Sequence, residues 1–128
     1  MNKSVLLKGA ILGTIAIIFG ALGAHALKNV LTPEQLSSFE TGVKYQMYHA
    51  LLLVMLSIMI KQIHSKYLLV AVNFIFIGVI LFSGSIYLLT IKNLFTLDYL
   101  KFVGPITPIG GILLVIGWCL LIVEGLKK

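Results

Sequence analysis

The side chains that could do chemistry lie in or beside long apolar blocks of the chain. Tyr45, Tyr48 and His49 share one face of a helix, because residues three and four apart are neighbours there. Polar groups inside a membrane segment cost free energy, so each one is a candidate for function. The full candidate polar cluster is His25, Tyr45, Gln46, Tyr48, His49, Asn73, Ser83, Ser85 and Thr107.

Three interpretations of this cluster are open. The plainest is that the groups form hydrogen bonds across helices and fix their packing, at about 1 kcal/mol or less each. The second is a neutral pathway for a transported solute. The third is a haem, metal or quinone site built on His25 and His49, although zinc would need further protein ligands and haem needs axial geometry.

The acidic residues argue against catalysis. All four lie outside the apolar blocks, so none completes a metal site or serves a proton-coupled transporter there. The chain also has no Ser-His-acid set, no glycine-rich phosphate loop and no pair of carboxylates facing one site. We therefore expect no enzyme, no catalytic residue, no metal and no cofactor. The acids are Glu34, Glu40, Asp98 and Glu124.

Composition indicates what must position these groups. Hydrophobic residues make up 59% of the 128 residues and charged residues 11%, whereas about a quarter of a soluble domain is charged. The apolar residues form four blocks, at about 5–27, 43–60, 67–91 and 106–123, and a membrane span needs about 20 helical residues. We expect an all-α polytopic membrane protein with residues 1–128 in one domain, a four-transmembrane-helix bundle.

The net charge of +6 does not indicate nucleic-acid binding, because the lysines stand in ones and twos at the block edges. Lys3, Lys8, Lys61, Lys66, Lys127 and Lys128 would lie at one membrane face, and Lys28, Lys44, Lys92 and Lys101 at the other. By the positive-inside rule both termini face the cytoplasm. His25 would then end the first span and His49 begin the second, both near the non-cytoplasmic interface.

The first block has two interpretations. Its lysines, apolar run and Ala24-His25-Ala26 resemble a signal peptide. Its glycines instead suit a helix that approaches a neighbour closely, and this interpretation is favoured because a discarded leader has no need of such spacing. The glycines expected at helix contacts in the whole chain are Gly9, Gly13, Gly20, Gly23, Gly84, Gly110 and Gly111.

Two helix starts can be read from local signals. Thr32, Pro33 and Gln35 have the pattern of an N-cap, first residue and capping box. They predict a short interfacial helix between the first two spans, which runs on into the second. Thr107 and Pro108 repeat the cap pattern, so the last helix is expected to begin at Pro108, with the Gly/Pro segment before it entering the membrane as irregular backbone.

Four ordered motifs carry a family resemblance. They are 20–27 (GALGAHAL), 39–51 (FETGVKYQMYHAL), 82–87 (FSGSIY) and 104–111 (GPITPIGG), with Gly117-Trp118 behind them. The chain resembles a family of small uncharacterised inner-membrane proteins, domain of unknown function 423, whose eukaryotic relatives are small transmembrane proteins. The resemblance implies four spans and a cell-membrane location, and it supplies no activity. The absence of arginine and of a transit peptide favours a bacterial plasma membrane.

The first functional expectation is a non-enzymatic accessory, assembly or interaction protein. Beyond the lipid bilayer, its partner would be a second copy of the chain or another membrane protein, and not a nucleic acid. A small transporter or channel is the first alternative. A haem-, metal- or quinone-binding membrane protein is the second.

Overall fold

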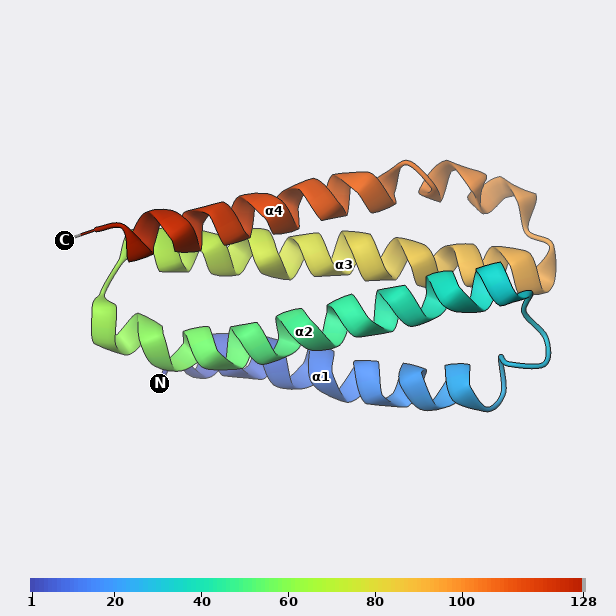
Figure 1. Ribbon diagram of the computed structural model, residues 1–128, viewed down its shortest axis with the longest axis horizontal. Coiled ribbons are helices and arrows are strands. Elements are labelled where there is room, and N and C mark those ends of the chain that lie inside the picture. Colours follow the sequence, from blue (N-terminus) through green and yellow to red (C-terminus); the bar gives the residue numbers. More distant parts are fainter. Residues whose placement is uncertain (128) are drawn as a thin grey trace.

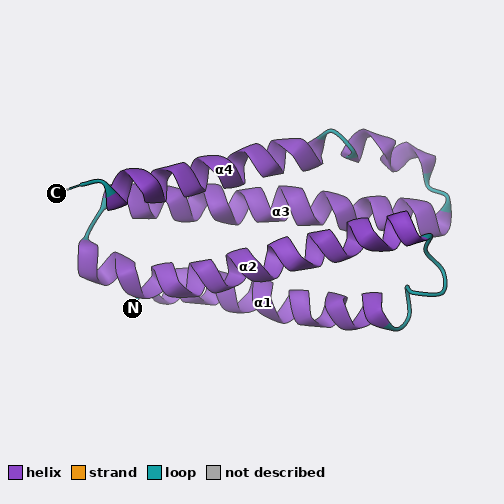
Figure 2. Cartoon of the chain, in the orientation of Figure 1, coloured by secondary structure: helices purple, strands orange, loops and turns teal. Residues whose placement is uncertain are grey.

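The computed structural model describes residues 1–127 and has four long helices in an antiparallel bundle (Figures 1 and 2). All four are long and apolar enough to cross a membrane, so the predicted all-α fold with four spans is confirmed. Lys128 of the lysine count lies outside the described residues. The elements are α1 (Lys3–Ala24), α2 (Pro33–Ile63), α3 (Lys66–Phe95), the short 3-10 helix η1 (Asp98–Val103) and α4 (Ile106–Gly125).

The central pair of the bundle is α2 and α3, with α1 packed on α2 and α4 packed on α3. Both described ends of the chain lie at the same end of the bundle as the α2–α3 connection (Figure 1). All four helices contribute to one apolar core, for example through Leu12, Leu53, Ile75 and Leu114. Antiparallel neighbours with short connections are the expected topology for such a chain.

Glycines set the closest helix approaches. A Cβ atom added to Gly9 on α1 would lie 2.8 Å from the Ala50 carbonyl oxygen of α2. One added to Gly110 on α4 would lie 2.8 Å from the Phe82 Cα of α3. Small residues allow such contact between backbones in a membrane. The two tight pairs, α1–α2 and α3–α4, therefore depend on positions without a side chain.

The other glycines at helix contacts are not all the ones that were predicted. Added Cβ atoms at Gly13, Gly20, Gly23 and Gly111 would lie 3.7, 3.5, 3.0 and 3.8 Å from neighbouring side chains. A Cβ atom added to Gly84 would have nothing within 4 Å, so the expectation that Gly84 lies at a helix contact is wrong. Gly117 was not among the expected packing positions, yet its added Cβ would lie 2.6 Å from Ile75 Cγ1.

The helix that begins at Pro33 is not a separate interfacial element. It is the first part of α2, which continues without a break to Ile63. The capping box is present, because the Gln35 N–H donates to Thr32 Oγ1 at 3.2 Å and the Thr32 N–H donates to Gln35 Oε1 at 3.0 Å. With 31 residues and a rise of about 1.5 Å per residue, α2 is about 46 Å long, more than a bilayer core needs.

The predicted start of α4 at Pro108 is wrong. The helix begins two residues earlier, at Ile106, after Pro105 in the N-cap position. Pro108 is tolerated because it still falls in the first turn, where backbone N–H groups have no partner within the helix. The segment expected as irregular backbone is shorter than predicted, because only Gly104 and Pro105 form a turn between η1 and α4, and Ile106 and Thr107 already belong to α4.

Candidate functional site

Gln46 lies at the centre of the buried polar residues. Its side-chain Nε2 donates to the Leu12 carbonyl oxygen of α1 at 2.8 Å. Its Oε1 accepts from the Tyr87 hydroxyl of α3 at 2.7 Å. The side chain is almost fully buried. One amide on α2 therefore links three helices. Lipid tails could satisfy neither its donor nor its acceptor.

Two buried serines on α3 make further links. The Ser83 hydroxyl donates to the Gly42 carbonyl oxygen of α2 at 2.7 Å. The Ser85 and Thr107 hydroxyl oxygens lie 2.6 Å apart, which joins α3 to α4. Thr107 is thus engaged across the helix interface and does not cap α4, where no side-chain cap bond is present.

His49 uses both ring nitrogens inside the protein. Its Nδ1 lies 2.7 Å from the Tyr45 carbonyl oxygen, and the Trp118 Nε1–H of α4 donates to its Nε2 at 3.1 Å. A carbonyl only accepts and an indole N–H only donates. The pattern therefore selects neutral imidazole with its proton on Nδ1. A metal ion or haem at Nε2 would have to displace Trp118.

An aromatic face surrounds this pair. The side chains of Tyr45, Tyr48 and Trp118 are 42%, 57% and 48% exposed. The ring centroids of Tyr45 lie 5.0 Å from Phe82 and 6.2 Å from Tyr48. Neither tyrosine hydroxyl has a hydrogen-bond partner within residues 1–127. The face therefore combines large exposed rings with two free hydroxyl groups on α2.

His25 and Asn73 do not join the other polar residues. His25 is exposed at the end of α1, next to Gly23, which contacts Phe39 of α2. His49 is ten residues further along α2 than Phe39, or about 15 Å, so the expectation that both histidines share one level is wrong. Asn73 is exposed on α3. The two histidines are separated because α2 begins at Pro33. The residues around His49, which were expected to form the first turns of the second span, therefore lie well inside the bundle.

A polar cavity of about 450 Å³ opens near the start of α2. Glu34, Ser38 and Thr41 line its α2 side, and the opposite side has Thr90 and Thr107 together with the apolar Ile86 and Leu89. Thr107 is also the residue that contacts Ser85. The lining has carboxylate, hydroxyl and amide groups, and it lies at the end of the bundle where α2 begins.

The buried polar groups are fully occupied by hydrogen bonds within the protein. Within residues 1–127, every buried side-chain nitrogen and oxygen has a hydrogen-bond partner. In the same range no three His, Cys, Asp or Glu side chains come together as a metal-ligand group. The arrangement holds helices in register and leaves no buried polar atom aimed at an absent ligand.

Tyr87 and Trp118 are the partners that the sequence-based cluster lacked. Tyr87 stands four residues after Ser83 on α3, so its position on a polar helix face was visible in the sequence. Trp118 is 69 residues from His49, and no periodicity connects them. Only the order of helices in the bundle brings the indole to the imidazole.

Comparison with known proteins gives a consistent result. The profile of a family described as "Protein of unknown function (DUF423)" matches residues 19–111. A UPF0382 membrane protein of Staphylococcus saprophyticus is 36% identical over 129 residues, covering 98% of each chain. The UPF0382 membrane protein YwdK of Bacillus subtilis is 33% identical over 126 residues, also covering 98% of each chain. No solved structure gives a significant match.

Proposed function

This chain belongs to the DUF423 family of membrane proteins of unknown function, and on that premise we propose that it is a non-enzymatic interaction protein. Its aromatic face, formed by Tyr45, Tyr48 and Trp118, docks against a transmembrane helix of a partner protein in a bacterial cell membrane. One observation carries the proposal: within residues 1–127 the buried polar side-chain atoms have hydrogen-bond partners, whereas the hydroxyls of the exposed Tyr45 and Tyr48 bond to no described residue.

The composition of the face supports docking. Tyr and Trp are enriched at the centres of protein interfaces, where they supply large rigid contact areas. Tyr48 is 15 residues from the start of α2 and 15 from its end at Ile63. It therefore lies inside a hydrocarbon core of about 30 Å whatever the register of α2. A hydroxyl at that depth gains from a hydrogen-bond acceptor on a neighbouring helix, at about 0.6 kcal/mol on average.

Site-specific photo-crosslinking in intact membranes tests this proposal. A benzophenone amino acid at Tyr48 should give a discrete protein adduct of fixed mass. The matched control is the same group at Ile17, which is also highly exposed but lies on α1. An adduct of equal yield from both positions, or lipid adducts alone from Tyr48, would contradict the docking face. Mass spectrometry of the adduct distinguishes a second copy of the chain from another membrane protein.

A second candidate function rests on the polar cavity. We propose as the alternative that it is the entrance of a pathway for a small neutral solute, continuing through Thr107 and Ser85. Hydroxyl and amide groups are the lining that such pathways use. Liposomes with the purified protein should then swell faster in glycerol than empty liposomes. Thr107→Val should abolish the difference while His25→Ala leaves it, and no difference at all would remove this candidate.

A further inference from the structure

A second cleft lies at the opposite end of the bundle, between α2 and α4, and its volume is about 760 Å³. Its walls are apolar and include Leu52, Met55 and Met59 of α2 and Leu121 of α4. Its mouth is polar and includes the residues of the α2–α3 connection and the last turn of α4. The cleft is therefore amphipathic along the bundle axis, polar at the membrane surface and apolar toward the middle.

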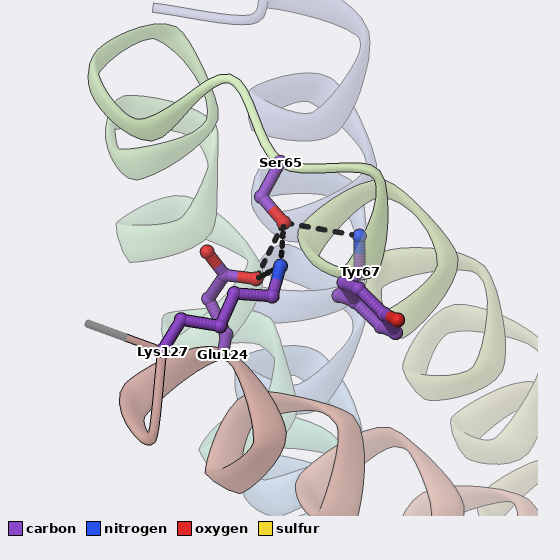
Figure 3. Close-up of polar contacts among 4 residues, drawn as sticks. All are labelled: Ser65, Tyr67, Glu124 and Lys127. Carbon is purple, nitrogen blue, oxygen red and sulfur yellow. Dashed lines mark hydrogen bonds and ion pairs between the residues drawn. The ribbon is translucent and has the colours of Figure 1, made fainter.

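The mouth has a defined geometry (Figure 3). The Lys127 ammonium lies 2.7 Å from Glu124 Oε2 and 3.2 Å from Ser65 Oγ, and 3.9 Å from the centre of the Tyr67 ring. Ser65 also donates to Glu124 and caps the start of α3 by accepting from the Tyr67 N–H. These bonds hold the last turn of α4 beside the N-terminus of α3.

The charge at the mouth is net positive. The Lys66 ammonium lies 5.7 Å from the centre of the Tyr67 ring that Lys127 also approaches, so two ammonium groups lie beside one aromatic ring. Glu124 is the one carboxylate among the described lining residues. The N-terminus of α3 adds the positive end of a helix dipole. The C-termini of α2 and α4 also lie here with the negative ends of their dipoles, so the positive charge that an anion would meet comes from the two lysine side chains, against one glutamate among the described lining residues.

We propose that this cleft binds an anionic phospholipid, with its phosphate near Lys66 and Lys127 and one acyl chain along the apolar wall. The wall runs from Leu52 to Ile63, a rise of about 16 Å along α2 at about 1.5 Å per residue. One leaflet of the hydrocarbon core is about 15 Å thick, which is the depth that an acyl chain occupies. Basic clefts between transmembrane helices at one membrane face are known to hold anionic headgroups.

Native mass spectrometry of the full-length protein in mild detergent tests the site, with phosphatidylglycerol as the probe and phosphatidylcholine as the neutral comparison. Phosphatidylglycerol should bind in a 1:1 ratio and more tightly. The double variant Lys66→Gln/Lys127→Gln should weaken it about 25-fold, since each lysine contributes about a fivefold factor near an anionic group. The matched control Lys92→Gln/Lys101→Gln removes the same charge at the other end of the bundle and should leave binding unchanged.

Glu124→Gln separates lipid binding from a purely structural role. Lys127→Gln and Glu124→Gln both break the same ion pair, so a structural role predicts the same effect from each. The proposal predicts opposite effects: phosphatidylglycerol binds more weakly to Lys127→Gln and more tightly to Glu124→Gln. Equal affinity for both lipids, effects of the same sign, or displacement of the lipid by inorganic phosphate at the same concentration would each overturn the proposal. None of these outcomes bears on the aromatic face.

Discussion

Gln46 is the residue on which the register of three helices most depends. We expect Gln46→Leu to lower the free energy of unfolding by about 1–2 kcal/mol, because hydrogen bonds between membrane helices contribute about 0.6 kcal/mol on average and up to about 1.7 kcal/mol. The Leu12 carbonyl and the Tyr87 hydroxyl would lose their amide partner. Unfolding by titration with SDS in mixed micelles measures the change.

The control for this prediction is a double-mutant cycle with Tyr87→Phe. If the Gln46–Tyr87 bond contributes, Tyr87→Phe should cost less in the Gln46→Leu background than in the wild type. Purely additive costs would show that the 2.7 Å contact does not stabilise the fold.

The His49–Trp118 bond has its own optical probe, because Trp118 is the single tryptophan of the chain. His49→Leu keeps the side-chain volume roughly constant and removes the acceptor of the indole N–H. The fluorescence emission of Trp118 should shift to shorter wavelength, since a polar partner of the indole is replaced by an apolar one. His25→Leu is the control and should leave the spectrum unchanged, and an unshifted His49→Leu spectrum would argue against the bond.

At the level of single residues the sequence was informative about which groups are polar and inside a span, but not about their partners. Gln46, His49, Ser83 and Ser85 were expected in the cluster, and the structure buries all four. Tyr48 and Asn73 were expected beside them and are exposed. Whether a residue faces lipid or the inside of the bundle depends on which helices lie beside its own. Hydropathy does not distinguish these two environments in a membrane, because lipid is as apolar as a helix.

Among the elements, the α3–α4 pair depends on Gly110. We expect Gly110→Ala to destabilise the protein by about 1–3 kcal/mol. The new Cβ would lie 2.8 Å from the Phe82 Cα and would force α4 away from α3. Gly84→Ala is the matched control within the same pair. Its Cβ would meet nothing within 4 Å, and alanine is the better helix former by about 1 kcal/mol.

Thermal unfolding in detergent compares the two variants directly. The Gly110→Ala midpoint should fall and the Gly84→Ala midpoint should stay level or rise. Equal losses from both would mean that glycine acts through helix flexibility and not through close contact.

The sequence predicts the start of a helix correctly where the local residues allow only one starting position. The capping box at Thr32 fixes the start of α2, and the sequence predicted it correctly. The start of α4 has two prolines that each suit a first turn, Pro105 and Pro108, so the local signal is ambiguous. A tertiary contact resolves it, because the Thr107 hydroxyl pairs with Ser85 and is then not available as a cap.

For the whole molecule, four spans followed from composition alone, whereas their packing order did not. In that order, Ser83 links α3 to Gly42 of α2, and Gln46 links α2 to α1. The same four blocks in another order would have the same hydropathy. The cleft between α2 and α4 and the aromatic face both result from this order, so neither could be predicted from the sequence.

The orientation of the whole molecule is the last prediction. Both described chain ends lie at one end of the bundle, together with Lys3 and Lys61, and the positive-inside rule favours the cytoplasm for that end. Alkaline phosphatase fused to the C-terminus should be inactive, whereas the same enzyme inserted after Lys28 in the α1–α2 connection should be active. Lys3→Gln/Lys61→Gln should invert part of the population, because the lysine excess at this end is small. Lys92→Gln/Lys101→Gln enlarges the excess and should leave one orientation. An active C-terminal fusion in the otherwise unchanged chain would reverse the assignment and place the cleft between α2 and α4 at the outer leaflet.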